Sequence, residues 1–295
     1  MKAVSAVLFI SLLAVSALAS EKVQITSMQS VISKVQELRL VDAPKDILLV
    51  FDIDNTLLTT EKSLGGDAWF NWQESKLKNR ETADLVAPDF DGLLRVQGYL
   101  FSLTQMRPPE QMTPPMVRAF QAAGHPVFLL TSRGWNYENI TEQELTRNGY
   151  DSSLTAPGPQ GGYAPKFLPY DVKHPEAACL TAEELTQWGL KEAKLSVYQN
   201  GVFFTSGQHK GAMLRSILCK TGKTYKNIVF VDDTEKHVDR VLLAYQNNPS
   251  VNVVSMRYGA MDSQVDGFNR SDKRTEIESW EKIKTVLGTV FERAF

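Results

Sequence analysis

Three apolar runs, each followed at once by polar residues, stand out in the pattern of hydrophobic and polar positions along the chain. They occupy residues 47–51, 126–130 and 228–231, and a weaker run follows at 251–256. Short apolar runs without alternation are typical of strands buried on both faces of a parallel sheet. Segments with helical patterning separate these strands. The alternation predicts an α/β protein with a doubly wound parallel sheet.

Weaker patterns add helices, a hairpin and a loop. Helices are predicted over residues 28–38, 114–123, 142–148 and 273–291, and over a segment that opens with a capping box at 181–184. A β-hairpin is predicted over residues 195–205, where Asn200-Gly201 provides the turn. Residues 157–169 are rich in glycine and proline, which predicts an irregular loop.

A polar, aromatic-rich stretch interrupts the alternation between the first and second apolar runs. Residues 63–111 show no strong sheet pattern and are long enough to form an inserted, mainly helical cap. We therefore predict a core made of residues 20–62 and 112–295. Trp69, Phe70 and Trp72 cluster in the insertion, where they either stack on a ligand or form the small core of the cap.

The N-terminal residues have the pattern of a secretory signal peptide. Lys2 precedes an apolar stretch from Ala3 to Leu18, and Ala17-Leu18-Ala19 offers a small-residue cleavage site. The sequence therefore predicts that residues 1–19 are removed and that the protein is exported, to the periplasm or as a secreted protein. No later apolar run approaches the length of a membrane span, so no span is expected after cleavage.

The composition bears on the partners of the protein and on the state of its two cysteines. The chain is 43% hydrophobic and 22% charged, as in ordinary globular proteins. Its formal net charge of −2 gives no indication of a nucleic-acid or membrane-surface partner. Cys179 and Cys219 either form a disulfide in an oxidising compartment or stay separate buried thiols, and the sequence does not decide between them.

Polar residues capable of chemistry follow each of the three strong apolar runs. The carboxyl ends of parallel strands share one edge of a sheet, so these residues can converge in space. A lysine before an apolar helix joins them. The resulting set is Asp52, Asp54, Thr131, Ser132, Lys210, Asp232 and Asp233. Acids at buried strand ends are costly unless a cation, a proton or a chemical task accompanies them, so we predict a functional site here.

These side chains suit a phosphate ester and a hard metal ion. Mg²⁺ prefers oxygen ligands and binds through one or two carboxylates while keeping waters and substrate phosphate. A carboxylate that attacks an anionic phosphoryl group faces repulsion, which a divalent cation and a lysine neutralise. Asp52 could then be the nucleophile that forms an aspartyl phosphate. Asp54 could protonate the leaving oxygen and later activate water.

The motifs resemble those of the haloacid dehalogenase (HAD) superfamily, in its phosphatase branch. The segment Asp52-Ile53-Asp54-Asn55-Thr56 matches the first motif of that superfamily, DxDx[TV]. The second, third and fourth motifs are matched in order by Thr131, Lys210 and Asp232-Asp233. The signal peptide and Gly65-Gly66-Asp67-Ala68-Trp69-Phe70 also resemble an exported bacterial group, DUF2608.

The resemblance implies a Rossmann-like core and a role for each matching residue. Asp52 would be the nucleophile and a Mg²⁺ ligand, and Asp54 would be the general acid/base that offers the metal its backbone carbonyl. The phosphoryl oxygens would be held by Thr131, Ser132 and Lys210, and the metal site completed by Asp233 or, next in order, Asp232. Because dehalogenases of the superfamily lack an acid at the position of Asp54, the implied activity is hydrolysis of a small phosphomonoester.

Other functions remain open from the sequence. The chain could be a binding or interaction protein on a scaffold that has lost catalysis, although a retired site has no reason to keep several acids. It could also be a phosphotransferase that uses an alcohol instead of water. Arg133 either binds a substrate anion or pairs with a surface acid. The sequence does not identify the substrate, because specificity lies in insertions whose geometry it does not provide.

Overall fold

An eight-stranded sheet forms the centre of the protein in a computed structural model that describes residues 20–291. The predicted signal peptide at 1–19 lies outside the described residues. The order of the strands is β1-β10-β9-β2-β5-β8-β7-β6. Their bounds are β1 (Glu21–Ile25), β2 (Ile47–Phe51), β5 (Val127–Thr131), β6 (Gly162–Phe167), β7 (Ser196–Gln199), β8 (Val202–Phe204), β9 (Asn227–Asp232) and β10 (Asn252–Tyr258).

The sheet is mainly parallel, as the sequence predicts. Parallel pairing runs without a break from β1 to β8, and only the pairs β8–β7 and β7–β6 are antiparallel. From β2 the chain passes to β5 and then to the far edge at β6, comes back through β7 to β8, and crosses to the other side of β2 for β9 and β10. The direction of winding therefore changes between β2 and β9. Open α/β sheets bind ligands beyond the carboxyl ends of the strands at such a point.

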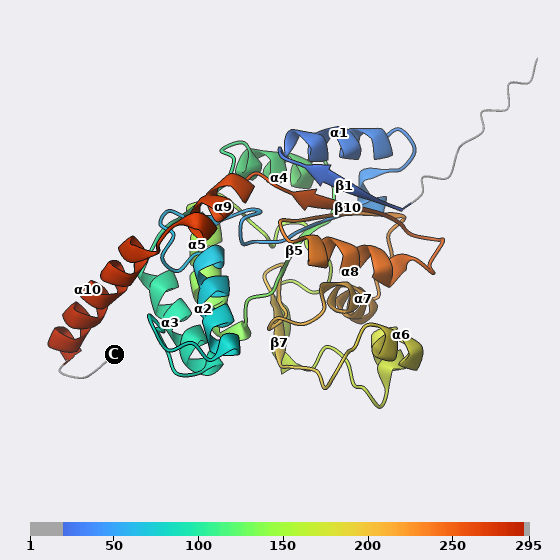
Figure 1. Ribbon diagram of the computed structural model, residues 1–295. Coiled ribbons are helices and arrows are strands. Elements are labelled where there is room, and N and C mark those ends of the chain that lie inside the picture. The colour runs from blue at the N-terminus through green and yellow to red at the C-terminus, as the bar shows by residue number, and fades with distance from the viewer. Residues whose placement is uncertain (1–19, 292–295) are drawn as a thin grey trace, which may run out of the picture.

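Helices cover both faces of this sheet (Figure 1). Helices α1 and α4 lie on one face, and α7 and α8 on the other. Leu49 and Phe51 of β2 join the first apolar cluster, whereas Leu48 and Val50 join the second. Burial on both sides explains the unbroken apolar run. The helices are α1 (Gln29–Leu38), α2 (Asp67–Asn79), α3 (Phe90–Leu103), α4 (Thr113–Ala122), α5 (Glu138–Arg147), α6 (Ala182–Gln187), α7 (Lys210–Thr221), α8 (Glu235–Tyr245), α9 (Asp262–Arg270) and α10 (Arg274–Phe291).

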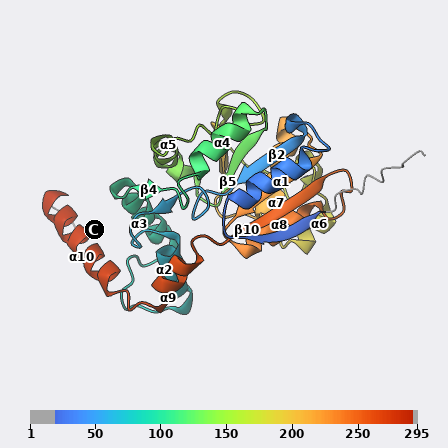
Figure 2. The ribbon, with the colours of Figure 1, turned by 90° about the horizontal axis from the view of Figure 1, so that it is seen from above.

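The insertion between β2 and α4 forms a separate group of helices at one end of the sheet. A two-stranded ribbon of β3 (Thr59–Thr60) and β4 (Met106–Arg107) brings its two connections side by side, and α2 and α3 lie between them. Helices α9 and α10 gather at the same end (Figure 2). Trp69 of α2 shares an apolar cluster with Phe268 of α9 and Trp280 of α10. The C-terminal helices therefore pack on the insertion.

The prediction of an irregular loop over residues 157–169 is wrong in part. Residues 162–167 form β6, which pairs antiparallel with β7 and shifts register between Tyr163 and Phe167. Proline cannot donate a hydrogen bond to a neighbouring strand, and edge strands tolerate it for that reason. Pro165 lies in such an edge strand. The predicted hairpin is confirmed as β7 and β8, and the capping box of Thr181 and Glu184 is also present.

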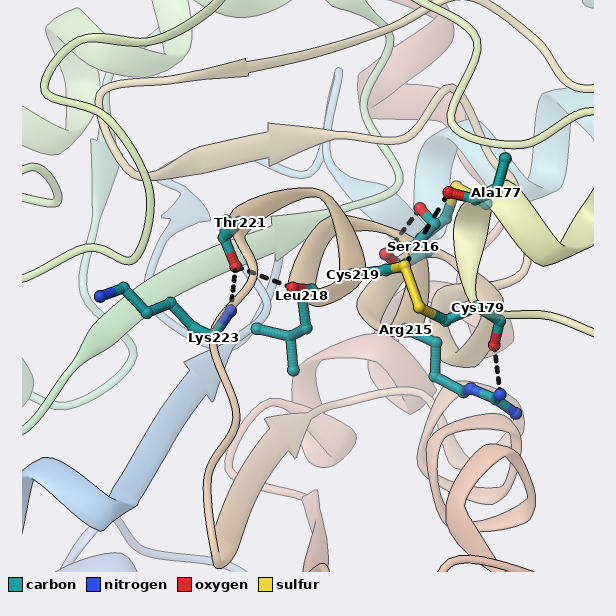
Figure 3. The surroundings of a disulfide bond; sticks show 9 residues. Ala177, Cys179, Arg215, Ser216, Leu218, Cys219, Thr221 and Lys223 are labelled. Carbon is teal, nitrogen blue, oxygen red and sulfur yellow. Dashed lines mark hydrogen bonds between the residues drawn. A yellow bond between two sulfur atoms is a disulfide. The ribbon is translucent and has the colours of Figure 1, made fainter.

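Cys179 and Cys219 form a disulfide, which answers the question that the sequence leaves open (Figure 3). The bond joins the segment before α6 to the C-terminal part of α7. Arg215 of α7 also donates a hydrogen bond to the carbonyl oxygen of Cys179. Two interactions thus tie this outer segment to α7. None of the described helices is long and apolar enough to cross a membrane.

Candidate functional site

Three carboxylates meet at the carboxyl ends of β2 and β9, and we call them the carboxylate cluster. Asp52 follows β2, and its backbone N–H donates to the carbonyl oxygen of Val231 at 2.9 Å, which places it beside Asp232 at the end of β9. Oxygens of Asp52, Asp232 and Asp233 all lie within 4.8 Å of one another. Asp52 and Asp232 are buried and Asp233 is half-buried. Oxygen ligands in this arrangement can hold a divalent metal ion.

Lys210, the first residue of α7, lies between two members of the cluster. Its Nζ donates to Oδ1 of Asp52 and to Oδ2 of Asp232, both at 2.6 Å. Burial lowers the pKa of Lys210, but the charges of Asp232 and Asp52 outweigh burial and raise it above its usual value. An ammonium group has three N–H donors, so one remains for a ligand. Gly211 permits close packing of α7, because a Cβ there would lie 2.1 Å from the carbonyl oxygen of Arg240 in α8.

The tight turn after β2 holds Asp233 in place. Asn55 adopts a left-handed conformation with φ of 55°, and its Nδ2 donates to Oδ2 of Asp233 at 3.2 Å. The hydroxyl oxygen of Thr56 accepts a hydrogen bond from the backbone N–H of Asp233 at 3.1 Å. Thr234 donates its hydroxyl to Oδ1 of Asp233 at 3.1 Å. Side chains of the first sequence motif therefore form hydrogen bonds directly to a residue of the fourth motif.

Burial is the largest cause of a raised pKa for every carboxyl group in the cluster. It raises the pKa of Asp52 to about 7, of Asp232 to about 6 and of Asp233 to about 8. Neighbouring carboxylates add to the effect, whereas Lys210 opposes it. Groups of this kind are stabilised by protons or by a bound cation, because either removes uncompensated negative charge.

We expect the metal-free protein to lose stability as the pH rises from about 4 to 8. The folded-state pKa values of the cluster lie above the unfolded value of 3.8, so the folded state binds more protons in this window and their stabilisation disappears as they leave. A divalent cation binds the ionised carboxylates, so it should raise the melting temperature more at pH 8 than at pH 5. Thermal unfolding with EDTA and with added Mg²⁺ measures both effects. If Mg²⁺ raised the melting temperature by the same amount at pH 5 and at pH 8, the result would contradict the expectation.

Asp54 lies outside the carboxylate cluster and pairs with Arg133. Nε of Arg133 donates to Oδ2 of Asp54 at 3.0 Å, and Nη2 donates to Oδ1 at 2.8 Å. Nη1 of Arg133 donates to the hydroxyl of Thr141 at 2.8 Å, and the guanidinium lies 4.3 Å from the ring centre of Phe101. Arg133 is 6% exposed, whereas the side chain of Asp54 is 31% exposed. The sequence leaves open whether Arg133 binds a substrate anion or pairs with a surface acid, and in the structure its partner is Asp54, an acid of the site.

The two hydroxyl residues at the end of β5 occupy different places. Thr131 is fully buried, and its hydroxyl accepts a hydrogen bond from the backbone N–H of Arg133 at 3.1 Å. Ser132 is half-buried, and its Oγ lies 3.5 Å from Nε2 of His237. Burial and then the charge of Lys210 lower the pKa of His237 to about 2, so this imidazole is neutral at physiological pH. The sequence gives no sign that His237 lies at this site, because a histidine within a helix such as α8 shows no distinctive pattern.

A cavity of about 130 Å³ separates the insertion from the loop after β5, and we call it the insertion cavity. Its walls come from the turn after β2, from α2 and α3, and from the loop after β5. It is lined by Asp54, Asp67, Phe70, Leu94, Gln97, Phe101, Ser132, Arg133, Gly134 and Tyr137. Of the three clustered aromatics, Phe70 lines this cavity, whereas Trp69 belongs to the apolar cluster of the insertion and Trp72 packs against it. Trp69 and Trp72 therefore form part of the small core of the cap, whereas stacking of an aromatic ring on a ligand stays a prediction.

Asp67 is a further acid at this site. It is the first residue of α2, and its Oδ2 accepts a hydrogen bond from Asn71 at 2.9 Å. Burial, followed by the charges of Asp54 and Asp52, raises the pKa of Asp67 to about 7. Acids are common in the first turn of a helix, so the sequence around Asp67 indicates only a helix start. Its position beside the other carboxylates depends on how the insertion folds back onto the sheet.

Comparison with known families covers nearly the whole described chain. A family model with the description "Protein of unknown function (DUF2608)" matches residues 24–290. The match includes the carboxylate cluster, Lys210 and the residues that line the insertion cavity. No protein with a curated description matches this sequence.

Proposed function

The chain belongs to the DUF2608 family, whose description names no activity, and we therefore propose a function from the chemistry of the site. We propose an exported, Mg²⁺-dependent phosphatase of the HAD type that hydrolyses a small phosphomonoester through an aspartyl phosphate. The observation that carries the proposal is the contact of buried Lys210 with Asp52 and Asp232, at 2.6 Å each, beside a third carboxylate. This arrangement suits the transfer of an anionic phosphoryl group.

Asp52 is the proposed nucleophile. Lys210 bonds to its Oδ1, which leaves Oδ2 to attack phosphorus. In the first step the bond between this oxygen and phosphorus forms, the ester P–O bond breaks, and the electron pair goes to the leaving oxygen. The third N–H of Lys210 is available to a phosphoryl oxygen, and the hydroxyl hydrogens of Thr131 and Ser132 are further donors. Repulsion between carboxylate and phosphoryl group is thereby reduced.

The carboxylate cluster fits a hard divalent cation. Its donors are oxygens only, they lie within 4.8 Å of one another, and their raised pKa values reflect negative charge that protons or a cation would neutralise. In the proposal Asp52, Asp233 and Asp232 hold Mg²⁺, and the backbone carbonyl of Asp54 is a further ligand. When bound, the metal would offset charge on the phosphoryl group.

Asp54 is the proposed general acid and base. It lines the insertion cavity, where the leaving group would lie. Its carboxyl group would give a proton to the leaving oxygen and then take a proton from the water that attacks the aspartyl phosphate, which releases phosphate and restores Asp52. Arg133 is a positioning residue in this scheme, because its two hydrogen bonds fix the orientation of Asp54.

The insertion cavity limits the size of the leaving group. Its volume of about 130 Å³ is well below the roughly 300–1,000 Å³ of pockets for drug-sized ligands. A small alcohol fits the proposal better than a nucleoside or a polymer.

We expect the purified mature protein to release phosphate from p-nitrophenyl phosphate when Mg²⁺ is present. EDTA should abolish the release and an excess of Mg²⁺ should restore it, because the carboxylates need a cation to approach an anionic substrate. The Asp233→Asn variant should need a higher Mg²⁺ concentration for half-maximal rate. Phosphate release that continues in EDTA would contradict the metal-dependent mechanism, and formation of a new ester with an added alcohol would indicate phosphotransfer.

A further inference from the structure

One residue in the wall of the insertion cavity has a buried acceptor atom that no described residue satisfies. Gln97 of α3 lines the cavity and is only 5% exposed. Its Nε2 donates to the carbonyl oxygen of Gly65 at 2.5 Å, which fixes the direction of the side-chain amide. Its Oε1 has no hydrogen-bond partner among residues 20–291. Buried polar atoms in folded proteins nearly always have a partner, so a ligand that donates a hydrogen bond is expected here.

The same cavity contains an acid that lacks a cationic partner. Asp52 and Asp232 share Lys210, and Asp54 has Arg133. Asp233 belongs to the carboxylate cluster, where the proposed metal would compensate its charge. Within the described part of the chain, Asp67 forms no salt bridge and has only the neutral amide of Asn71 as a side-chain partner. Its carboxylate is therefore the one cavity acid whose charge neither a side chain nor the metal compensates.

The remaining walls favour an organic cation over a second anion. Phe70, Leu94 and Tyr137 supply apolar surface. The hydroxyl of Tyr137 already donates to the carbonyl oxygen of Leu94 at 2.6 Å. The guanidinium of Arg133 already contacts both Asp54 and the face of Phe101. Aromatic rings attract cations through their faces, and Phe70 is an aromatic residue in the wall of this cavity.

We propose that the insertion cavity binds a leaving group that carries a protonated primary amine, so that the substrate is the phosphate ester of a small amino alcohol. The carboxylate of Asp67 pairs with the ammonium group, and Oε1 of Gln97 accepts one of its N–H bonds. This inference rests on the proposed phosphatase function, because it concerns the alcohol part of the same substrate. The amine binds without reacting, and the bonds to phosphorus change as described above.

Related leaving groups would make fewer favourable contacts with Asp67 and Gln97. A neutral hydroxyl can donate to Gln97, but it leaves the charge of Asp67 without a counter-charge. A quaternary ammonium compensates that charge, but it has no N–H to donate to Gln97. A primary ammonium meets both requirements in one group. The small volume of the cavity further restricts the alcohol to a short chain.

The test measures binding of three phosphate esters to the Asp52→Asn protein, which cannot turn them over, in the presence of Mg²⁺. The esters are 2-aminoethyl phosphate, 2-hydroxyethyl phosphate and phosphocholine, which have similar lengths and differ in charge and in N–H donors. We expect 2-aminoethyl phosphate to bind at least about 10-fold more tightly than either of the others, as one charge-assisted contact allows. A second substitution, Asp67→Asn, should bring the ratio between the amino and hydroxyl esters close to one. Asp91→Asn is the matched control, because Asp91 is an exposed acid in the first turn of α3, and it should leave the ratio unchanged.

Two results would overturn the inference. The first is binding of 2-aminoethyl phosphate that is no tighter than binding of the hydroxyl ester, or no binding at all. This comparison needs no change at Asp67 and stands even if an Asp67 variant fails to fold. The second is a loss of Mg²⁺ affinity in the Asp67→Asn protein without a change in the ratio, which would make Asp67 a metal ligand.

Turnover by the wild-type protein separates this inference from the proposed function. Hydrolysis of all three esters without a preference would leave the phosphatase proposal intact and refute the amine site. Selective binding of 2-aminoethyl phosphate without phosphate release from any ester would support the amine site and refute the phosphatase proposal.

Discussion

Replacement of Asp52 by Asn is expected to reduce phosphate release by about 10⁴-fold or more, because the proposed mechanism begins with attack by this carboxylate. An amide of the same shape can still accept a hydrogen bond from Lys210, but it is a poor nucleophile. The measurement is the steady-state rate with p-nitrophenyl phosphate and Mg²⁺. Phosphate release at the wild-type rate would remove Asp52 from the role of nucleophile.

Stability measurements distinguish this loss of activity from unfolding. Burial raises the pKa of Asp52 to about 7, so at pH 8 the metal-free protein contains a buried, ionised group that the folded state disfavours. Asn removes that charge. The melting temperature of metal-free Asp52→Asn protein at pH 8 should therefore equal or exceed that of the wild type. An inactive variant with a lower melting temperature would point to a damaged fold.

A comparison with Asp54→Asn separates the proposed roles of the two acids. Loss of a general acid/base typically costs roughly 10²–10⁴ in rate, which is less than loss of the nucleophile. p-Nitrophenol leaves without needing a proton, so the first step should stay fast while hydrolysis of the aspartyl phosphate becomes slow. Asp54→Asn should therefore show a burst of p-nitrophenol before slow turnover, whereas Asp52→Asn should show none.

Replacement of Lys210 by Met is expected to destabilise the protein by about 3–5 kcal/mol at pH 8, the cost of leaving buried charges unpaired. Lys210 is 1% exposed and is the ion-pair partner of both Asp52 and Asp232. Their pKa values should rise further without it, so the cost should be smaller at pH 5, where the folded state takes up protons. Urea unfolding of the metal-free protein at the two pH values measures this difference.

Lys226→Met is a suitable control for this experiment. The side chain of Lys226 is 63% exposed and pairs with Asp42 at 2.8 Å and with Asp46 at 3.4 Å. Such surface pairs contribute at most about 1 kcal/mol. The double variant Asp52→Asn/Lys210→Met should lose less stability than Lys210→Met alone, because one of the unpaired charges is absent. A similar loss for both lysine variants would mean that the buried ion pairs contribute little.

The sequence predicts best the elements whose pattern is local and whose burial is complete. β2, β5 and β9 are unbroken apolar runs because both faces of each strand are covered. In contrast, β1 and β6 are edge strands with many exposed residues, so they carry little hydrophobic signal. The helical pattern of residues 273–291 predicts α10, but it does not show that this helix packs on the insertion.

The same difference applies to the site. The sequence predicts that Asp52, Lys210 and Asp232 converge, because they lie at the ends of parallel strands or begin a helix at one edge of the sheet. The structure shows this contact. It does not predict the contact between Asp54 and Arg133, since the long side chain could turn in several directions. It also misses Asp67 and Gln97, because their place depends on the packing of α2 and α3 against the loop after β5.

In an oxidising environment, the disulfide would hold the protein together after a protease had cut the chain between the two cysteines. The segment at residues 191–195, between α6 and β7, is largely exposed and would be accessible to a protease. A cut there would divide the chain, yet the bond between Cys179 and Cys219 would keep the two fragments covalently joined. The fragment that contains Lys210 would thus stay attached to the fragment that contains Asp52. A nicked molecule would migrate as two pieces only after reduction, and it would retain both halves of the buried ion pair in one particle.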